Sequence, residues 1–258
     1  MTGITPRPFV WYELMSNDPA ASGDFYRKVV GWNVKDSGMP GMSYSILSLG
    51  EISIGGMLGL TDEMRAGGAR PCWIGYVGVA DVDADAARIA AAGGKVLRAP
   101  ADIPGIGRWA MVTDPHGAPF VIFRGTTDAS PTPQAPGTPG TMGWHELHAG
   151  DGQAAWAFYS STFGWTAAEA MDMGPMGIYQ IFGAGGAPIG GMMTRSPETP
   201  GPFWLYYVNV DGTADAVARA TGAGAKLLMG PHEVPGPMWV AIFTDPQGAT
   251  FAVVSAKP

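Results

Sequence analysis

Two stretches of sequence decide the fold: WYELMSNDPAASGDFYRKVVGW at residues 11–32 and WHELHAGDGQAAWAFYSSTFGW at residues 144–165. They align without a gap, 133 residues apart, and agree at 9 of 22 positions. The shared residues include a Trp-x-Glu-Leu start, an aspartate, a Phe-Tyr pair and a closing Gly-Trp. Self-similarity at this distance indicates two copies of one structural module.

Further motifs recur with nearly the same offset. Ile-Gly-Gly-Met occurs at 54–57 and again at 189–192, and TDPHGAPF at 113–120 is matched by TDPQGATF at 244–251. Between the halves, residues 125–141 are rich in Pro, Thr and Gly, a composition typical of a linker without a packed core. The sequence therefore predicts a first module at 1–124, a linker at 125–141 and a second module at 142–258.

Within each half, the hydrophobic pattern predicts a strand, a helix and three strands, twice over. Asn17 or Asp18 is expected to cap the first helix, with Pro19 in its first turn and Gly31 at its end. An aspartate, Asp81 or Asp83, is expected to open the second helix. The predicted class is α+β, with four β-α-β-β-β units.

Composition excludes several kinds of partner. The net charge of −7 and the absence of a Lys/Arg-rich run argue against nucleic acid. No apolar run is long enough to span a membrane. The N-terminal segment lacks the pattern of a signal peptide, and a single cysteine, Cys72, allows no disulfide framework, so a cytoplasmic location is expected. We expect small-molecule partners; the sparsely charged surface also permits a homodimer.

The motifs together resemble the vicinal oxygen chelate superfamily, which holds glyoxalases, extradiol dioxygenases and bleomycin-resistance proteins. The resemblance covers nearly the whole chain outside the linker, and the Trp-x-Glu-Leu start and Ile-Gly-Gly-Met look like a bacterial subgroup of two-module, glyoxalase-like proteins. It implies that pairs of β-α-β-β-β units form two tandem cupped sheets, each around a cavity. It leaves the reaction open, because this fold hosts isomerases, lyases, oxygenases and binding proteins.

In metal-dependent members of the family, three inward positions carry His, Gln or Glu. The matching positions here hold Trp11 and Trp144, the segments 73–75 and 204–206, and Val121 and Ala252. A hard divalent cation needs oxygen or imidazole ligands, which these residues do not supply. The sequence therefore predicts no metal site and no cofactor.

Two glutamates are the candidate catalytic residues. Alternate side chains of a strand share a face, so Glu13 lies on the face of Trp11, and Glu146 on the face of Trp144. Desolvation in a Trp-lined cavity would raise the pKa of such a carboxyl group and make it a general base. The alternative is that each glutamate is a buried polar group that anchors neighbouring backbone or a tyrosine.

Large repeated side chains are the candidate ligand-binding groups, because small-molecule pockets combine aromatic walls with a few polar groups. Their alternative role is to fill the sheet core. "HELH" at 145–148 is not the helical zinc motif, because its histidines are three residues apart on a predicted strand. The predicted ligand-binding residues are Trp11, Tyr44, Met57, Trp73, Tyr76, Trp144, His148, Tyr179, Met192, Trp204 and Tyr207.

Two functions follow from these residues and the resemblance. One is a metal-independent lyase, isomerase or hydroxylase that uses Glu13 and Glu146. The other is a binding protein without chemistry that sequesters an antibiotic or a metabolite, as bleomycin-resistance proteins do.

Overall fold

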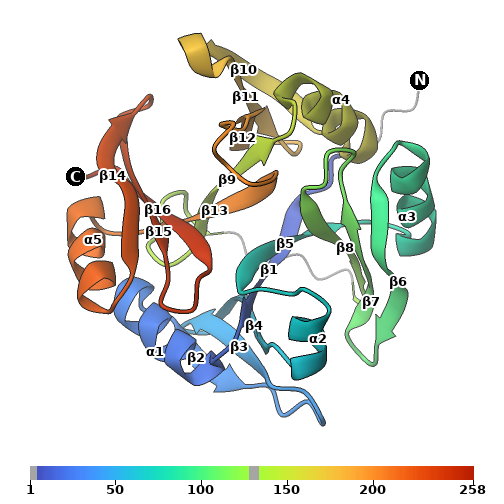
Figure 1. Ribbon diagram of the computed structural model, residues 1–258, viewed down its shortest axis with the longest axis horizontal. Coiled ribbons are helices and arrows are strands. Elements are labelled where there is room, and N and C mark those ends of the chain that lie inside the picture. The colour runs from blue at the N-terminus through green and yellow to red at the C-terminus, as the bar shows by residue number, and fades with distance from the viewer. Residues whose placement is uncertain (1–4, 128–133) are drawn as a thin grey trace. The chain divides into compact units, whose positions relative to one another are not determined.

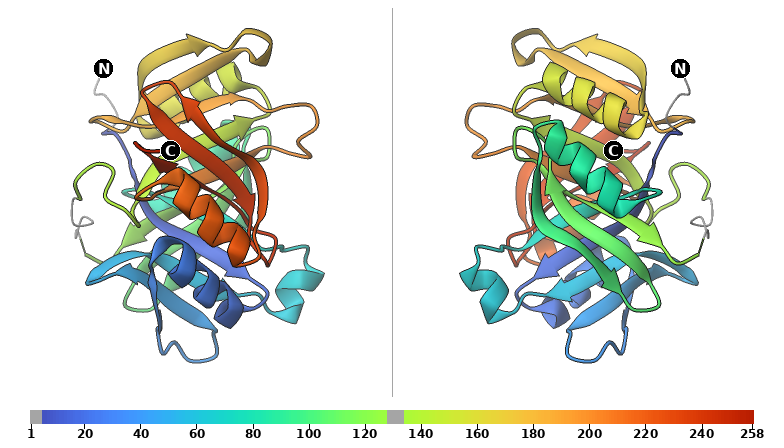
Figure 2. Two further views of the ribbon diagram at one scale, coloured as in Figure 1. Left: turned by 90° about the vertical axis from the view of Figure 1, so that its left-hand side faces the viewer. Right: turned by 90° about the vertical axis from the view of Figure 1, so that its right-hand side faces the viewer.

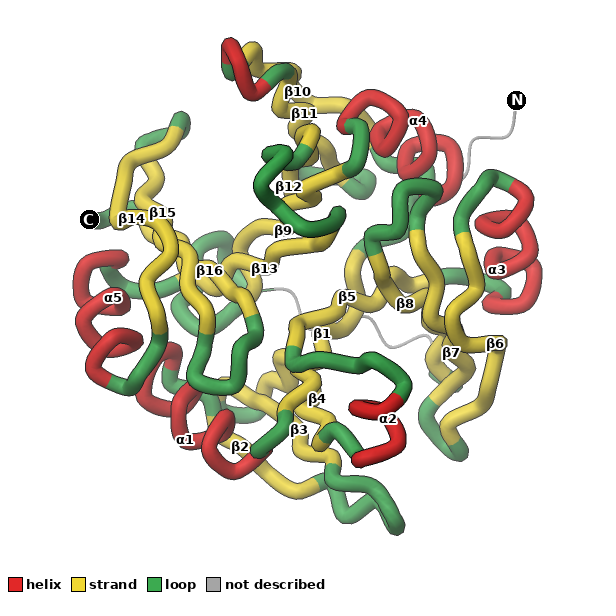
Figure 3. Tube along the Cα trace, viewed as in Figure 1, coloured by secondary structure: helices red, strands yellow, loops and turns green. Residues whose placement is uncertain are grey.

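The computed structural model describes residues 5–127 and 134–258, and consists mainly of β-strands with a few helices (Figure 3). Residues 128–133 of the predicted linker lie outside the described residues. The first half contains two repeats of strand, helix and three strands (Figure 1): β1 (Phe9–Ser16), α1 (Pro19–Val30), β2 (Asn33–Asp36), β3 (Tyr44–Leu49) and β4 (Ile52–Gly59), then β5 (Cys72–Gly78), α3 (Val82–Ala91), β6 (Lys95–Ile103), β7 (Gly107–Thr113) and β8 (Pro119–Gly125). A short helix, α2 (Asp62–Ala66), lies between them.

The second half repeats this order. Its elements are β9 (Met142–Ala149), α4 (Gly152–Phe163), β10 (Thr166–Asp172), β11 (Ile178–Gly183) and β12 (Pro188–Thr194), then β13 (Phe203–Asn209), α5 (Thr213–Gly222), β14 (Lys226–Val234), β15 (Met238–Thr244) and β16 (Thr250–Ser255). A single 3₁₀ turn, Gly174–Met176, precedes β11. None of the helices in the described residues is long and apolar enough to cross a membrane.

The predicted helix boundaries are confirmed. The Asp18 carboxylate accepts a hydrogen bond from the Ala21 N–H and caps α1, and Gly31 ends that helix in the left-handed conformation at φ 79°. The Asp81 carboxylate caps α3 in the same way. Side-chain caps satisfy amide groups that a helix N-terminus otherwise leaves unpaired, so these aspartates fix where the helices begin.

Each half of the chain forms one eight-stranded sheet. The strand order is β2-β3-β4-β1-β5-β8-β7-β6 in the first half and β10-β11-β12-β9-β13-β16-β15-β14 in the second. Within a repeat the last strand runs parallel to the first, as β4 does with β1 and β12 with β9. The structure thus confirms the predicted α+β class, with four β-α-β-β-β units in two tandem modules.

The four repeats pack in two compact units that do not follow the two halves. The middle-repeat unit comprises Met1–Val10, Gly75–Pro131 and His145–Trp204, and the end-repeat unit comprises Trp11–Ile74, Thr132–Trp144 and Leu205–Pro258. Each unit therefore takes one repeat from each half of the chain.

Matching helices pair inside each unit (Figures 1 and 2). In the end-repeat unit, Arg219 of α5 donates a hydrogen bond to the Val29 carbonyl of α1 at 3.1 Å. In the middle-repeat unit, Arg88 of α3 donates to the Thr162 carbonyl of α4 at 2.9 Å. Both arginines thus place a positive group at a helix C-terminus, where the helix dipole favours it.

The Phe-Tyr pair and the Asp-Pro-x-Gly turn meet in the core of the end-repeat unit. The buried Trp73 indole donates to the Tyr26 hydroxyl at 2.8 Å, and this hydroxyl donates to Asp245 Oδ2 at 3.0 Å. The other carboxylate oxygen of Asp245 accepts the backbone N–H groups of Gln247 and Ala249. Burial raises the pKa of Asp245, and these hydrogen bonds partly oppose that rise. We call this chain the tryptophan–tyrosine–aspartate relay.

The middle-repeat unit contains the matching relay. Trp204 donates to the Tyr159 hydroxyl at 3.1 Å, and this hydroxyl lies 3.5 Å from Asp114 Oδ2. Asp114 accepts the backbone N–H groups of its own turn at residues 116–118. Each relay therefore joins a helix to a turn that belongs to the other half of the chain.

The double glycine of Ile-Gly-Gly-Met leaves room for backbone on one face and for an aromatic ring on the other. A Cβ on Gly55 would lie 2.4 Å from the Tyr12 carbonyl oxygen of the neighbouring strand. A Cβ on Gly56 would lie 1.9 Å from the Tyr44 hydroxyl, and one on Gly191 would lie 2.1 Å from Tyr179 Cζ. The second glycine of each pair therefore allows a tyrosine ring to lie across the strand.

Replacing Gly191 by alanine is expected to displace the Tyr179 ring. Because the ring can rotate away, we expect a loss of only about 1 kcal/mol in the free energy of unfolding, at the low end for an added methyl group. Urea unfolding and a crystal structure of the variant would measure both effects. Gly186→Ala is the control, because its Cβ would meet no heavy atom within 4 Å. A variant with an unmoved ring contradicts this account of the glycine.

His145 gives the fold a predictable response to acid. Its ring is 6% exposed and stacks on Phe9 at 4.4 Å, and its Nδ1 contacts the Ile189 carbonyl at 2.6 Å. Burial lowers its pKa from 6.5 to about 4. Between pH 6.5 and pH 4 the unfolded chain therefore binds more protons than the folded chain does. The free energy of unfolding falls by about 3 kcal/mol as the pH is lowered through this range.

The His145→Gln variant should therefore lose less stability than the wild type between pH 7 and pH 4. Urea unfolding at several pH values measures the pH dependence of the free energy of unfolding for both proteins. The contributions of groups that both proteins share, such as Asp245, cancel when the two are subtracted. The exposed His116, replaced by the glutamine that stands at its counterpart Gln247, is the control and should keep the wild-type slope. Equal slopes for wild type and His145→Gln would contradict the assignment.

Candidate functional site

The first candidate site surrounds Glu13 in the end-repeat unit. Glu13 lies on β1 directly beside Gly56, and its side chain is 9% exposed. The Tyr44 ring reaches across Gly56 from β3 and forms a hydrogen bond with the carboxylate. Trp11 donates its indole N–H to the Tyr44 hydroxyl at 3.2 Å. Three predicted site residues, Trp11, Glu13 and Tyr44, are thus brought together as one chain of hydrogen bonds.

The neighbours of Glu13 keep their protons near neutral pH. Burial raises the pKa of the Tyr44 phenol well above its ordinary value, and the Glu13 charge and hydrogen bond raise it further. Burial, and then the Glu13 charge, raise the pKa of the Cys72 thiol to about 12. Since the thiolate is the nucleophilic form of cysteine, Cys72 acts here as a neutral wall of the site.

The second candidate site surrounds Glu146 in the middle-repeat unit. Tyr179 donates to Glu146 Oε2 at 2.9 Å, in the same way that Tyr44 bonds to Glu13. His148 Nε2 lies 2.9 Å from the other oxygen, Oε1. This is a hydrogen-bond distance, but the two groups are not aligned for a hydrogen bond, so Nε2 is buried without a hydrogen-bond partner among the described residues. The His148 ring stacks on Phe203 at 4.6 Å with an interplanar angle of 1°.

The two sites share a carboxylate–phenol pair and differ beside it. At the position of His148 the first half has Met15, and at the position of Phe203 it has Cys72. Trp144 is half-buried and lies two residues before Glu146 on β9, as Trp11 does before Glu13. Thus Tyr179, Glu146 and His148 converge; the sequence predicts Glu146 as a catalytic residue and the other two as ligand-binding residues.

Four predicted ligand-binding residues are not brought to these sites. Trp73 and Trp204 are buried and use their indole N–H groups in the two relays. Met57 is 1% exposed and its end faces helix α1 near Gly23, and Met192 is fully buried at the matching position. All four occupy the core, which was the alternative role for these side chains. Strand alternation explains this, because each lies one residue away from a site-facing position.

Tyr76 and Tyr207 stand beside the positions where metal-dependent relatives carry their third ligand. Tyr76 pairs with Val121 in the sheet, and Tyr207 pairs with Ala252. Both tyrosines are buried, and the Tyr76 ring meets Phe123 edge to face at 6.1 Å.

The residues present do not fit the divalent metal that the family resemblance implies. Among the described residues, no group of three or more His, Cys, Asp or Glu side chains could hold a metal ion. Around Glu13 the neighbours are an indole, a phenol and a protonated thiol; around Glu146 one imidazole stands beside the carboxylate. These groups supply too few oxygen and imidazole ligands for a hard divalent cation, so the chemistry proposed for the two sites uses no metal.

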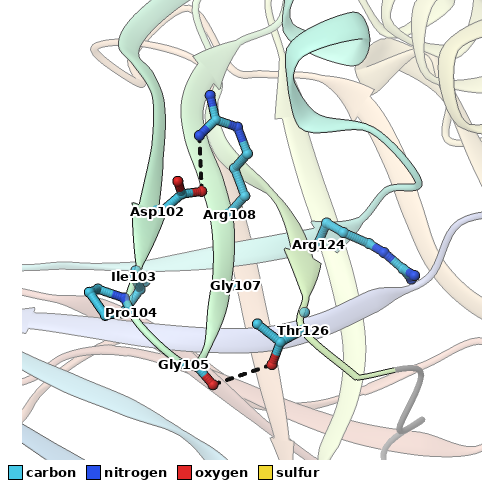
Figure 4. Close-up of a pocket in the computed structure, with 9 residues that line it drawn as sticks. Asp102, Ile103, Pro104, Gly105, Gly107, Arg108, Arg124 and Thr126 are labelled. Carbon is cyan, nitrogen blue, oxygen red and sulfur yellow. Dashed lines mark hydrogen bonds and ion pairs between the residues drawn. The ribbon is translucent and has the colours of Figure 1, made fainter.

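A separate pocket of about 340 Å³ lies at the β6–β7 hairpin of the middle-repeat unit (Figure 4). One of its two arginines, Arg108, binds Asp83 through two hydrogen bonds and Asp102 through a third; the other is Arg124. The bonds with Asp83 lower the pKa of that carboxyl group. Two carboxylates thus already neutralise this guanidinium, and the pocket does not share residues with either glutamate site.

The sequence did not identify Phe203 as a site residue. It also did not identify Gly56 and Gly191 as the residues that make room for the Tyr44 and Tyr179 rings. The available signal was parity: Phe203 lies on the face of β13 opposite Trp204, and Cys72 lies likewise opposite Trp73. For the glycines, the signal was their register beside the two glutamates, which becomes visible once the strands are paired.

Comparison with known proteins places this geometry in a family. The model of the "Glyoxalase/Bleomycin resistance protein/Dioxygenase superfamily" matches residues 9–122 and 141–253. A protein of Mycobacterium tuberculosis (strain CDC 1551 / Oshkosh) named "Putative glyoxylase CFP32" is 31% identical over 252 residues, covering 96% of this chain and 94% of the relative. The "Anthracycline biosynthesis protein DauV" of Streptomyces sp. (strain C5) is 31% identical over 279 residues, covering 100% and 96%.

Solved structures agree on the fold. The Mn(II)-bound glyoxalase from Novosphingobium aromaticivorans has a TM-score of 0.69 at 16% identity, covering 100% of this chain and 84% of that one. The 2,3-dioxygenase LapB from Pseudomonas sp. KL28 has a TM-score of 0.64 at 13% identity, covering 100% and 94%. With both halves matched by the family model and two relatives aligned over nearly their whole length, the chain belongs to the glyoxalase/bleomycin resistance/dioxygenase superfamily.

Proposed function

We propose that the protein is a metal-independent acid–base enzyme, of lyase or isomerase type, that acts on a small apolar or aromatic molecule. The observation that carries this proposal is the repeated carboxylate–phenol pair: Tyr179 bonded to Glu146 at 2.9 Å, and Tyr44 bonded to Glu13. A carboxylate in largely desolvated surroundings is a suitable base for a carbon-bound proton. A phenol that keeps its proton can donate a hydrogen bond to the oxygen that becomes negative.

Aromatic surroundings support the substrate class. Trp11 and Tyr44 flank Glu13, and Phe203 lies behind His148 beside Glu146. Aromatic walls with a few polar groups are typical of small-molecule sites. The name of the Streptomyces relative refers to the biosynthesis of anthracyclines, which contain fused aromatic rings.

The Glu13 site also supports a second candidate function, binding without chemistry. Three of its neighbours, the Trp11 indole, the Tyr44 phenol and the Cys72 thiol, are uncharged near pH 7. A site of this kind can hold a ligand by apolar contact and one carboxylate hydrogen bond without transferring a proton. The two candidate functions make different predictions for a glutamine variant.

The Glu13→Gln/Glu146→Gln double variant separates them. Glutamine keeps the shape of glutamate but is not a base, so turnover of a substrate found by screening aromatic carbonyl compounds should fall by about 10²-fold or more, while the ligand-induced thermal shift changes little. Glu51→Gln, on an exposed loop, is the control and should behave as wild type. Unchanged turnover in the double variant would contradict catalysis; stabilisation by ligands with no turnover in any variant would favour binding.

Metal removal tests the metal-independent part. Protein purified without chelator should contain substoichiometric zinc, nickel, iron and manganese by elemental analysis, because the two donor sets lack enough ligands. Dialysis against EDTA should leave the melting temperature and turnover unchanged. One tightly bound equivalent of any of these metals, with activity lost on its removal, would overturn the proposal.

A further inference from the structure

The two glutamate sites differ at two neighbouring positions that change their chemistry. His148 lies on the strand of Glu146 and is one alternation step away from it, so both side chains point to the same face. Phe203, from β13, stacks flat against the His148 ring. The first half has Met15 and Cys72 in their places, so its carboxylate has no imidazole at the matching position.

His148 Nε2 is the feature that calls for an explanation. It is buried and 2.9 Å from Glu146 Oε1, yet it makes no hydrogen bond with the described residues. Buried polar atoms without partners are uncommon, and a catalytic role is one of the explanations for them. A proton placed between Nε2 and Oε1 needs only a small rotation of either side chain, because the two atoms already stand at hydrogen-bond distance.

We propose that proton transfer takes place in the Glu146 site alone and that His148 is its proton relay. This inference rests on the proposed function. Glu146 takes a proton from a carbon atom of the substrate, whose electron pair moves to an electronegative atom. The proton then passes from Oε1 to His148 Nε2, which restores the carboxylate and leaves an imidazolium beside it. Reversal of the second step returns the proton to Glu146 and, from there, to product or solvent.

Phe203 is the positioning residue of this relay. Its ring lies parallel to the imidazole, and the stacking limits rotation of His148 about its χ2 angle. The Tyr179 hydroxyl occupies the other oxygen of Glu146, so the carboxylate presents Oε1 to His148. The first half has Met15 and Cys72 at the positions of His148 and Phe203, and neither neutral side chain can take up a proton as an imidazole does, so the Glu13 site is left to bind.

The probe for the test is 5-nitrobenzisoxazole, a small aromatic compound. A base removes its C3 proton, the N–O bond breaks, and the electron pair ends on a coloured phenolate, with a nitrile formed at the carbon. Wild-type protein should open the ring faster than protein unfolded in urea. Glu146→Gln should lower kcat/KM by about tenfold or more, and His148→Met by several-fold. His116→Gln, which changes an exposed histidine outside both glutamate sites, should leave the rate unchanged.

Two further readouts separate a relay from a merely structural role. Phe203→Leu should lower the rate, and Phe203→Tyr, which keeps the stacking, should restore it. In the Glu146→Gln background, the pair Met15→His and Cys72→Phe should raise the rate several-fold by grafting the relay beside Glu13. Melting temperatures exclude variants that fail to fold.

The outcomes distinguish the inference from the function on which it rests. Ring opening that is shared equally between Glu13 and Glu146, or that is unaffected by His148→Met, would overturn the relay and leave acid–base catalysis standing. A wild-type rate equal to that of the Glu13→Gln/Glu146→Gln variant would overturn both. Loss in Glu146→Gln and His148→Met, rescue by Phe203→Tyr and gain on grafting would establish the relay.

Discussion

The fold depends on a buried carboxylate, Asp245, whose two oxygens both need hydrogen-bond donors. Asp245 lies in a tight turn whose backbone N–H groups bind one of its oxygens, while the Tyr26 hydroxyl, itself bonded to Trp73, binds the other. Leaving such a group unpaired in the core would cost several kcal/mol. Because the turn and the helix come from different halves of the chain, the cost of an unpaired carboxylate specifies which repeats pack together. Asp114 and Tyr159 impose the same choice on the middle-repeat unit.

The closing tryptophans of the two opening stretches add a second constraint of the same kind. Trp32 donates its indole N–H to the Gly140 carbonyl at 2.6 Å, and Trp165 donates to the Arg7 carbonyl at 2.7 Å. Gly140 and Arg7 precede β9 and β1, the strands that carry Glu146 and Glu13. Each tryptophan therefore fixes the segment that leads into a glutamate strand, and so connects the core to the register of a site.

The repeat, the helix caps and the four β-α-β-β-β units could all be predicted, because they depend on local signals such as Asp18 before Pro19 and on hydrophobic periodicity. Repetition and strand parity predicted Glu146, Tyr179 and His148 separately as site residues, but not the contacts among them. The core positions of Trp73 and Met57 did not, because an apolar side chain is equally compatible with either face until the strands are paired. The exchange of repeats between halves was also hidden, since hydrogen bonds such as that between Tyr26 and Asp245 join residues 219 positions apart.

One backbone arrangement thus carries two sites that are capable of different chemistry. The glycine beside each glutamate admits the tyrosine, the tyrosine forms a hydrogen bond with the carboxylate, and in the Glu146 site this bond uses Oε2 and leaves Oε1 facing His148. In the Glu146 site His148 faces that second oxygen and Phe203 stacks on the His148 ring, whereas the first half has Met15 and Cys72 at the matching positions. These positions lie outside the relays and the helix pairs. The chain can therefore change the chemistry of one site without disturbing the packing on which both depend.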